Sequence, residues 1–588
     1  MEKLSRLNLL VSRDFLALRL GYDPKKFNYI LYKTPNHLKY TNFEIPKKSG
    51  GVRTISAPND RLKLVQKRLA KLLQECVQDL EIRHPIRKNI SHGFHKDRSI
   101  ISNALIHRGR RYVLNFDLQD FFGTINFGRV SGYFQKDSAF QLPEEVANTI
   151  AHIACYNGSL PQGSPCSPVI SNLIAHILDL RMLRFAEKTG CRYSRYADDI
   201  TFSTNQKVFP ERLASKDIDN SSVWNLSEDL VGAVTRAGFK IHPKKTRMNI
   251  TGSRQEVTGL ITNHVVNIKR EYWLTTRAMC DRLFREGQYV PPKSLQESSP
   301  VQPTKNLSIL EGRLSHIFNV KRHSIDPGLL IKTNNADDLS SFERTYGQFL
   351  FYKLFVALNR PLVVTEGPSD RVFVRTALKE RKKKFSALFH AETNSPVFSL
   401  LKVSLERRRL LSVAPGTSGQ GELIRKYRRT VEQFGAKEMK FPVIILTDND
   451  KSAQDNVFGK ASKMQQDLGI PSAKMNISSA DQFVYLGYNL YLIKIPHAGD
   501  ASEKTIESLI PDAWLKAKYK NKIFDVKKPN GSATHLSKMD FASQVIEENS
   551  AQIDFSKFDP LFDLLVKVLE DYRALQQKNA IVVKEKSV

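Results

Sequence analysis

Three aspartates in unusual surroundings indicate phosphoryl-transfer chemistry. Asp117 lies in the apolar stretch RRYVLNFDLQDFFGTI, and about 80 residues later Asp198 and Asp199 stand side by side in YADDITFS. Taken singly, an Asp-Asp turn and an aspartate at a strand end are ordinary features. Together they suggest a two-metal site, because two Mg²⁺ ions would offset the repulsion and serve the attacking 3′-oxygen and the leaving pyrophosphate. Mg²⁺ takes one or two carboxylates together with phosphates.

A second set of acids follows two apolar runs later in the chain. Glu366 and Asp370 lie in PLVVTEGPSD, and Asp448 and Asp450 lie in FPVIILTDND. A spacing of two places Asp448 and Asp450 on one side of extended backbone. Parallel strands would bring Glu366 and Asp448 to the same carboxyl edge of a sheet, where α/β proteins form their sites. One such acid is usually a helix cap, but two clusters favour a site for one or two divalent ions.

Short strands, a hairpin and helices must hold the first set of acids. Residues 111–260 alternate apolar strands with helices, with a strand ending at Asp117 and a hairpin carrying YADD at its tip. FEIPKKSGGVRTISAPND predicts another hairpin, turning at Gly50 and Gly51. RLKLVQKRLAKLLQECV has helical periodicity.

The second set of acids requires an α/β arrangement. About 80 residues with helix-like sequence separate its two strands, which predicts a parallel sheet. A long helix is expected over 341–358, another near DPLFDLLVKVLEDYRAL, and a surface linker over QYVPPKSLQESSPVQPTK. The segment GTSGQGEL, residues 416–423, is expected to be a flexible loop, with a phosphate cradle as the alternative.

Composition favours a polyanionic partner. The 588 residues suffice for about three or four domains, and 90 Lys and Arg against 60 Asp and Glu give a formal net charge of +30. Such an excess favours nucleic acid, because neutralising phosphates releases counterions. The five cysteines form no CxxC pair, and no apolar run resembles a signal peptide or a membrane span. A cytoplasmic protein without a membrane partner is expected. The runs KERKKKF and LERRRLL are expected to be solvated helix faces.

Several motifs together resemble those of reverse transcriptases. FDLQDFF, LPQGSPCSP and YADD occur in the order and spacing of that family, GFKIHPKKTR resembles the motif that follows, and the likeness spans residues 25–320. The resemblance implies a right-hand polymerase that uses dNTPs, with Mg²⁺ on Asp117, Asp198 and Asp199. It also implies Phe122 as a steric gate against the ribonucleotide 2′-OH, Gln162 and Gly163 beside the incoming nucleotide and template, Lys48 (or Lys47) and Arg53 on the triphosphate, and Lys245 as proton donor to pyrophosphate. Without the family, Phe122 reads as a core aromatic and the cations as surface residues.

Two short segments resemble marks of bacterial retron reverse transcriptases. They are NALIH, just before the Asp117 strand, and VTG, after the lysine-rich motif. The resemblance implies RNA contacts at Asn103, His107, Val257, Thr258 and Gly259; as bare peptides they read as a helix surface and a strand-end turn. It also implies a cognate non-coding RNA that is both primer and template. Synthesis would begin at the 2′-OH of an internal guanosine, and the product would be branched RNA-linked single-stranded DNA.

The second acidic set resembles a different family. EGPSD with DND is similar to the Toprim domain of topoisomerases, bacterial primases and overcoming-lysogenization-defect nucleases. The nuclease branch would add Glu507 as a metal ligand and Lys538 as a cation for developing phosphate charge; the bland alternatives are an exposed helix acid and a surface lysine. A topoisomerase needs a gate-sized domain that is not left over, and a primase would duplicate polymerase chemistry. A metal-dependent endonuclease that cuts a nucleic-acid target is therefore expected.

The expected architecture is multidomain, α+β and α/β: a right-hand polymerase followed by a Toprim α/β domain with a mainly parallel sheet. The predicted divisions are fingers and N-terminal region 1–110, palm 111–260, thumb 261–330, linker helix 331–360, Toprim domain 361–512 and helical extension 513–588. The resemblance to fusions of a retron reverse transcriptase with a Toprim nuclease implies a role in antiphage defence, in which the DNA product restrains or triggers the nuclease. A homo-oligomer is possible. One alternative makes the C-terminal half a non-catalytic binding and assembly module. Another is a group II intron maturase, which predicts a splicing domain and often an HNH nuclease, neither of which is evident.

Overall fold

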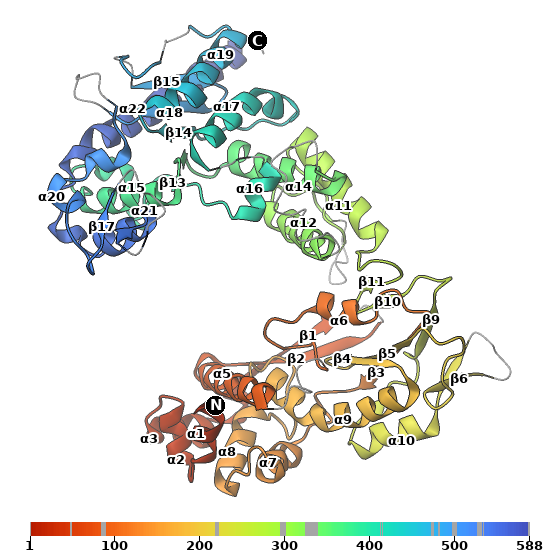
Figure 1. Cartoon of the computed structure of the whole chain (residues 1–588). Coiled ribbons are helices and arrows are strands. Elements are labelled where there is room, and N and C mark those ends of the chain that lie inside the picture. The colour runs from red at the N-terminus through yellow and green to blue at the C-terminus, as the bar shows by residue number, and fades with distance from the viewer. Residues whose placement is uncertain are drawn as a thin grey trace. The chain divides into compact units, whose positions relative to one another are not determined.

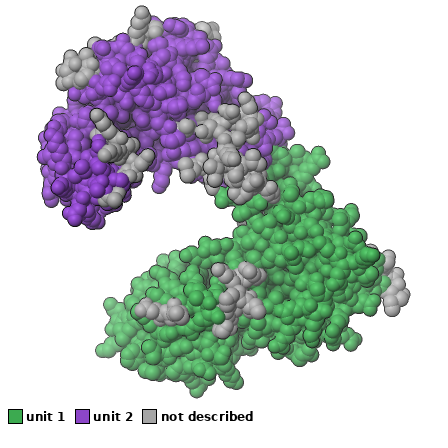
Figure 2. Space-filling model, viewed as in Figure 1, with its two compact units in different colours: residues 1–274, 292–301, 319–326 green, residues 275–291, 302–318, 327–588 purple. Residues whose placement is uncertain are grey.

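The computed structural model divides the chain into two compact units, which Figure 2 colours separately. Unit 1 comprises Met1–Leu274, Pro292–Val301 and Asn319–Asp326, and unit 2 comprises Thr275–Pro291, Gln302–Phe318 and Pro327–Val588. The residues described are 2–47, 50–83, 90–217, 223–293, 301–323, 339–411, 413, 415–471, 475–479, 482–496, 503–525, 532 and 534–585. Within these ranges, no helix is both long and apolar enough to cross a membrane. The finer predicted divisions stay predictions.

Unit 1 combines helices with short antiparallel strands (Figure 1). Its helices are α1 (Glu2–Asn8), α2 (Arg13–Arg19), α3 (Pro24–Asn28), η1 (Tyr29–Lys33), α4 (Asn36–Lys39), α5 (Asp60–Arg83), α6 (Ile100–Ile106), α7 (Phe127–Lys136), α8 (Glu144–Ala154), α9 (Ser167–Thr189) and α10 (Glu228–Arg236). Its strands are β1 (Tyr40–Pro46), β2 (Val52–Pro58), β3 (Tyr112–Gln119), β4 (Arg192–Tyr196), β5 (Asp199–Thr204), β6 (Ala214–Lys216), β7 (Trp224–Leu226), β8 (Lys240–Ile241), β9 (Arg247–Ile250), β10 (Glu256–Val257) and β11 (Leu260–Ile261).

Strand β3 is the centre of the main sheet of unit 1. It pairs with β5 along one edge and with β9 and then β8 along the other, all antiparallel, and β4 lies outside β5. Helix α9 packs against β4, and the apolar core gathers side chains from β3, β5 and helices α5, α7, α8 and α9. The strand does not end at Asp117 as predicted, because β8 pairs with Leu118 and Gln119 and extends it by two residues.

Two other predicted elements of unit 1 are confirmed. Strands β1 and β2 form the expected antiparallel hairpin, in which Pro46 pairs with Val52. The periodic stretch after it is helix α5, which buries Leu62, Val65 and Leu69 as the pattern requires.

Unit 2 also mixes helices and strands. Helix α11 (Arg270–Glu286) belongs to unit 2 from Thr275 onwards, and helix α12 (Leu307–Arg322) belongs to it up to Phe318. Its other helices are α14 (Ser341–Phe351), η4 (Tyr352–Val356), α15 (Pro368–Glu380), η5 (Ser386–Leu388), α16 (Leu405–Leu411), α17 (Gly416–Glu432), α18 (Lys451–Ala453), η6 (Gln454–Phe458), α19 (Gly459–Asp467), η7 (Ile506–Leu509), α20 (Asp512–Leu515), α21 (Lys538–Asp540), η8 (Phe541–Glu547), η9 (Ser550–Gln552), η10 (Ser556–Phe558) and α22 (Asp559–Glu585). Its strands are β12 (Leu362–Val364), β13 (Ser399–Leu400), β14 (Val443–Thr447), β15 (Phe483–Gly487), β16 (Leu490–Lys494), β17 (Ile523–Phe524) and β18 (His535–Leu536).

The main sheet of unit 2 has the order β13-β12-β14-β16-β15. The first three pairings are parallel, and β15 is antiparallel to β16. Every residue of β12, β14 and β16 is buried, as is typical of parallel strands covered on both faces. Side chains of α15 and α22 share one apolar core with Val363, Ile444 and Ile493.

The segment GTSGQGEL is a helix, so the prediction of a flexible loop is wrong. Helix α17 begins at Gly416 and includes the whole segment. Gly421 serves close packing, since a Cβ atom there would lie 2.0 Å from the carbonyl oxygen of Asn456 in η6. A glycine needed for such an approach looks, in sequence, like a glycine needed for flexibility.

Candidate active sites

The three aspartates of unit 1 meet at the tip of the β4–β5 hairpin, as predicted. The antiparallel register places Asp117 of β3 opposite Asp199 of β5. Asp198 lies in the two-residue turn between Tyr196 and Asp199, and its carbonyl accepts the N–H of Leu118 at 2.9 Å. Side chains directly opposite in an antiparallel pair lie about 5 Å apart, so the carboxylates occupy one small region.

Repulsion and burial act on the protonation of these carboxylates. Burial, reinforced by Asp117, raises the pKa of Asp199 to about 8. Burial also raises the pKa of Asp198, while Lys245 and Arg53 oppose that shift. The Nζ atom of Lys245 lies 2.5 Å from Oδ2 of Asp117. Full ionisation of Asp198 and Asp199 at neutral pH therefore calls for more positive charge than Lys245 and Arg53 supply.

Arg53, Gln162 and Gly163, three of the predicted nucleotide-binding residues, come from two segments that are joined by a backbone hydrogen bond. The N–H of Ser56 in β2 donates to the carbonyl of Gln162 at 2.8 Å. Gly163 has φ of 125°, and a Cβ atom there would lie 2.6 Å from the carbonyl oxygen of Ser56. Strand β2 also carries Arg53, whose charge reaches Asp198. Lys48 lies outside the described residues.

Phe122 sits between two other aromatic rings. Its half-buried side chain packs edge to face on Phe121, with ring centroids 5.4 Å apart. The ring of Phe94 lies 6.0 Å away, and that side chain is 43% exposed. Phe122 therefore packs against the core while its side chain stays partly exposed, and its role as a steric gate stays a prediction.

Asn103 and His107 are completely buried beneath the same hairpin. Ser194 Oγ donates to Asn103 Oδ1 at 2.6 Å and lies 2.8 Å from His107 Nε2, and His107 Nδ1 lies 2.7 Å from Ser203 Oγ. Burial lowers the pKa of His107 to about 3, so its ring is neutral. Their burial corrects the expectation of RNA contact by these two side chains: they support strands β4 and β5 instead.

The VTG segment forms a tight hairpin turn. Val257 pairs with Leu260, and Thr258 and Gly259 between them have φ of 47° and 81°, the two positive values that a type I′ turn requires. Val257 is buried, which also corrects the expectation of RNA contact by its side chain. Thr258 is half-buried and donates through Oγ1 to the carbonyl of Ile100, at the start of α6, and Gly259 is exposed.

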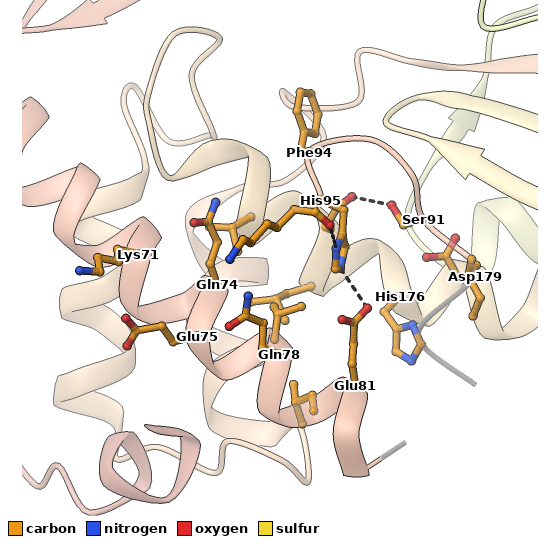
Figure 3. Close-up of a pocket in the computed structure, with 17 residues that line it drawn as sticks. Lys71, Gln74, Glu75, Gln78, Glu81, Ser91, Phe94, His95, His176 and Asp179 are labelled. Atoms are coloured by element: carbon orange, nitrogen blue, oxygen red, sulfur yellow. Dashed lines mark hydrogen bonds and ion pairs between the residues drawn. The ribbon is translucent and has the colours of Figure 1, made fainter. Parts of the chain in front are cut away.

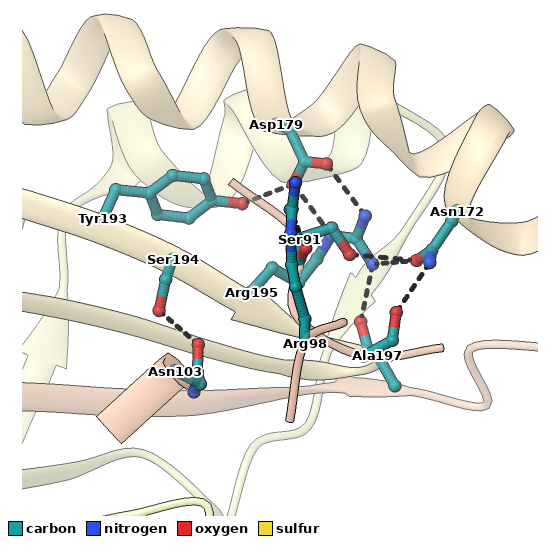
Figure 4. A network of polar contacts seen from close by, with 10 residues as sticks. Ser91, Arg98, Asn103, Asn172, Asp179, Tyr193, Ser194, Arg195 and Ala197 are labelled. Carbon is teal, nitrogen blue, oxygen red and sulfur yellow. Dashed lines mark hydrogen bonds and ion pairs between the residues drawn. The ribbon is translucent and has the colours of Figure 1, made fainter. Parts of the chain in front are cut away.

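A buried ion pair supports the hairpin from helix α9, as Figure 4 shows. Asp179 accepts two hydrogen bonds of 2.8 Å from Nε and Nη2 of the fully buried Arg195, and a third of 2.7 Å from the hydroxyl of Tyr193. Arg195 Nη1 donates to the carbonyl of Ala197, the residue before Asp198, and to Asn172. Sequence reasoning missed this network. Its signal was an aspartate inside the apolar helical run IAHILDLRML and an arginine inside a strand.

A cavity of about 610 Å³ borders that network, between α5, the segment at residues 90–96 and α9. Figure 3 shows Glu81, Ser91, His95, His176 and Asp179 among the residues around it. His95 Nε2 lies 3.1 Å from a Glu81 oxygen, which also pairs with Arg98. Its lining does not include the three aspartates of the hairpin tip.

The second acidic cluster gathers at the carboxyl edge of the parallel sheet of unit 2. Leu362 pairs with Val443, so Glu366 after β12 and Asp448 after β14 reach the same edge. Asp448 Oδ1 accepts the N–H of Ile506 at 2.9 Å. The next residue, Glu507, is therefore carried to the cluster by η7.

Lys538 contacts two carboxylates of this cluster. Its Nζ lies 2.6 Å from Glu507 Oε1 and 3.2 Å from Asp370 Oδ1, and Glu507 is only 2% exposed. The alternative interpretation from sequence, in which Glu507 is an exposed helix acid and Lys538 is a surface lysine, is therefore wrong. Asp370 also accepts the N–H of Gly367 at the start of α15. Asp450 caps α18 by accepting the N–H of Ala453.

Two acids of the unit 2 cluster, Glu366 and Asp448, have raised pKa values. Burial, with Asp370 adding to it, raises the pKa of Glu366 to about 7. Burial and the nearby Glu366 raise the pKa of Asp448 well above its usual range. Within the described part of the chain, the buried Oε2 atom of Glu366 has no hydrogen-bond partner. A buried, unpartnered carboxylate oxygen is costly unless a proton or a cation meets it.

Comparison with known proteins identifies the family. The family model "Reverse transcriptase (RNA-dependent DNA polymerase)" matches residues 45–267. The retron Ec86 reverse transcriptase of Escherichia coli is 32% identical over 249 residues, which cover 42% of this chain and 70% of that protein. The chain belongs to the retron reverse transcriptases. The retron Mx162 reverse transcriptase of Myxococcus xanthus is 33% identical over 276 residues, 44% of this chain and 54% of that protein. The chain thus spans about half the length of that relative.

A telomerase of Candida albicans superposes with a TM-score of 0.33 and 10% sequence identity, covering 70% of this chain and 66% of that one. A TM-score this low supports no conclusion about this chain. In this retron reverse transcriptase, the family model includes Asp117, Asp198, Asp199 and Lys245 and ends before unit 2.

Both clusters of this retron reverse transcriptase fit Mg²⁺ by charge and by their hard oxygen donors. Within the described ranges, no three His, Cys, Asp or Glu side chains are already arranged to hold a metal ion by themselves. Mg²⁺ does not require such a cage, because it keeps several waters and binds one or two carboxylates plus substrate phosphates. The raised pKa values of Asp199 and Glu366, and the unpartnered oxygen of Glu366, are the observations that favour a cation.

Proposed function

We propose that the chain is an RNA-directed DNA polymerase. The observation that carries this proposal is the β3–β5 register, which sets Asp117 opposite Asp199 and beside Asp198 inside the family match. Carboxylates concentrated in this way are the donors that nucleotide transfer needs. The attacking hydroxyl oxygen forms a bond to the α-phosphorus, the bond to pyrophosphate breaks, and the pyrophosphate leaves.

The side chains around the hairpin tip have distinct proposed roles. Asp117, Asp198 and Asp199 would hold Mg²⁺, which when bound stabilises charge on the attacking and leaving oxygens. Arg53, together with Lys48 or Lys47, holds the triphosphate. Lys245 donates the proton that the leaving pyrophosphate takes up.

Two further features select and seat the nucleotide. The ring of Phe122 excludes a ribonucleotide by occupying the space of its 2′-OH. The 160–164 loop, joined to β2 through Ser56, seats the nucleotide and the template at Gln162 and Gly163. A planar ring and a glycine backbone differ in kind from the cations, because they act by shape rather than by charge.

The RNA partner is proposed from the family. The relatives are named retron reverse transcriptases, and we infer that this chain uses a cognate non-coding RNA as primer and template. Synthesis begins at the 2′-OH of an internal guanosine, and the product is a branched RNA-linked single-stranded DNA. The excess of 90 Lys and Arg over 60 Asp and Glu suits that partner.

For unit 2 we propose a Toprim-type, metal-dependent nuclease that acts in defence against phage. The convergence of Glu366, Asp370, Asp448 and Glu507 at one sheet edge supports it, with Lys538 beside them. The cluster would hold one or two divalent ions, and Lys538 would stabilise charge that develops on the phosphate. A non-catalytic binding and assembly role for unit 2 is the competing proposal.

A reciprocal pair of variants tests both proposals in the full chain. Asp198→Asn removes one carboxylate charge and should lower the rate of DNA synthesis by at least about 1,000-fold, with cleavage intact. Glu366→Gln should abolish Mg²⁺-dependent cleavage of DNA or RNA, with DNA synthesis intact. Circular dichroism of each variant, matched to the parent, checks folding.

The outcomes separate the alternatives. DNA synthesis by Asp198→Asn at the parental rate contradicts the polymerase site. Cleavage that survives Glu366→Gln contradicts the nuclease site, and a parent protein inert towards both DNA and RNA favours the assembly role. Sequencing the nucleic acid that copurifies with the chain tests the partner, since a branched RNA–DNA molecule is expected.

A further inference from the structure

Unit 1 carries a second hollow, of about 430 Å³, whose lining is strongly cationic. Helix α9 contributes Arg181, Arg184 and Lys188, helix α10 contributes Arg236, and Arg212 comes from the segment before β6. Asp229 is the one acidic residue in the lining. We call this hollow, with its five cations and Asp229, the basic groove. Its lining includes none of the three aspartates of the hairpin tip.

Among the described residues, no acid forms an ion pair with a cation of the basic groove. None of the five forms an ion pair with another described residue, whereas Arg425 and Arg428 on α17 pair with Glu422 and Glu432 of their own helix. Like charges held close together repel each other, so an external anion would stabilise them.

Rigid elements, not mobile side chains alone, bring these cations together. Helices α9 and α10 are in contact, and α10 buries Leu230 and Val234 in the core of unit 1. Ser227 caps α10 by accepting the N–H of Leu230 and donates through Oγ to the carbonyl of Arg212 at 2.6 Å. The backbone of Arg212 is thereby fixed to the start of α10.

The spacing of the cations exceeds what one phosphate can use. Arg181 and Lys188 are seven residues apart on one helix, which is about 10 Å along its axis, and Arg184 lies between them on the same face. Arg212 and Arg236 come from different elements. A row of phosphates fits this arrangement better than a free nucleotide or a single anion does.

We propose that the basic groove binds the sugar–phosphate backbone of structured RNA. This inference rests on the proposed function, in which an RNA is the template and is present before any DNA is made. Charges dominate the lining, so the groove would hold RNA by backbone and shape rather than by base sequence. Each neutralised phosphate releases counterions, which makes the binding steeply dependent on salt.

The test measures binding of a double-stranded RNA hairpin to the full chain at several salt concentrations. The variant Arg184→Gln/Lys188→Gln/Arg236→Gln removes three cations of the groove. We expect the slope of log K against log salt to fall by about three, and the Kd near physiological salt to rise on the order of 100-fold. The charge-retaining variant Arg184→Lys/Arg236→Lys should keep the parental slope.

A matched control removes the same charge elsewhere on unit 1. Arg61, Lys63 and Lys67 are exposed cations of α5 that form no ion pair with other described residues and do not line the groove. Arg61→Gln/Lys63→Gln/Lys67→Gln should leave the slope within about one of the parental value. An equal loss in both triple variants would mean that net charge, not the groove, binds RNA, and would overturn the proposal.

Two further arms identify the ligand. Inorganic phosphate at matched ionic strength should not displace the RNA, and displacement would overturn the proposal in favour of a single-anion site. A DNA duplex should bind more weakly than the RNA, and tighter binding with the same loss in the groove variant would also overturn it.

Failure of the groove is distinguishable from failure of the proposed function. Asp198→Asn, which tests DNA synthesis, leaves the groove intact and should keep the parental slope. A groove variant with an unchanged slope overturns this inference whether or not the chain makes DNA.

Discussion

The two acidic clusters are stabilised in different ways. At the hairpin tip of unit 1, Lys245 contacts one carboxylate and is itself 41% exposed, while the buried Arg195 and His107 hold the hairpin from its inner side. In unit 2, Lys538 enters the cluster and contacts two carboxylates directly. In unit 1 the supporting cation, Arg195, lies behind the hairpin, so the side of the carboxylates that faces solvent stays open to a large substrate. In unit 2 the cation Lys538 lies among the carboxylates and already supplies part of the positive charge of the site.

Breaking the buried ion pair of unit 1 is expected to have the largest effect on stability. Arg195→Met leaves Asp179 charged, buried and unpaired, and should lower the free energy of unfolding by about 3–5 kcal/mol. Denaturant-dependent hydrogen exchange of the amides in β4 and β5 measures it. The double variant Arg195→Met/Asp179→Leu should recover much of the lost stability. If Arg195→Met alone lowered the free energy of unfolding by less than about 1 kcal/mol, the buried ion pair would not be what stabilises the hairpin.

The neutral ring of His107 predicts a loss of stability in acid. Its pKa is about 3 in the folded chain, below the usual 6.5, so between these values the unfolded chain binds the proton more readily. The contribution is complete above pH 6.5 and decreases by about 1.4 kcal/mol for each pH unit below it. Lowering the pH from 7 to 5 should therefore destabilise the parent by about 2 kcal/mol more than His107→Gln.

Unfolding free energies of both proteins at the two pH values provide the measurement. Because the other titrating groups are shared, the difference between parent and variant isolates His107. Identical pH dependence in the two proteins would show that His107 is not kept neutral beneath the hairpin.

Replacing the lysine of each acidic cluster by glutamine tests most directly whether the two clusters are stabilised differently. These two substitutions are expected to change the free energy of unfolding least. Lys538→Gln removes the cation from two buried carboxylates and should cost about 1–3 kcal/mol. Lys245→Gln removes a solvent-screened contact and should cost less than about 1 kcal/mol. Thermal unfolding with and without Mg²⁺ measures both, and Mg²⁺ should stabilise Lys538→Gln more than it stabilises the parent. Equal costs would show that the clusters do not differ in this way.

Sequence predicted the features that depend on local pattern. The alternation around YADD predicted the hairpin tip, and the apolar runs before Glu366 and Asp448 predicted parallel strands; both arrangements are present. Such features follow from periodicity, because the alternation of apolar and polar residues that marks a strand is contained within a few residues. The end of β3 was predicted wrongly, because it depends on pairing with the distant strand β8.

What sequence could not predict is which polar residues face inward. Asn103 and His107 were expected to contact RNA, but both are buried against Ser194. The pair of Asp179 and Arg195 was missed, because a charged residue in an apolar run shows its partner only when distant segments are brought together. For the same reason, the local sequence around Glu507 and Lys538 favoured surface positions, and only the Toprim resemblance assigned them to the acidic cluster.

The place of β3 in its sheet has a consequence for the chain during its synthesis. Strand β3 finds its neighbours only in residues 199–204 on one edge and 240–250 on the other. Until about half of unit 1 has been made after it, this strand has two unpaired edges and Asp117 has no companion carboxylate. The nascent chain is thus without its hairpin-tip site, and its central strand is exposed to aggregation until residue 250 has left the ribosome.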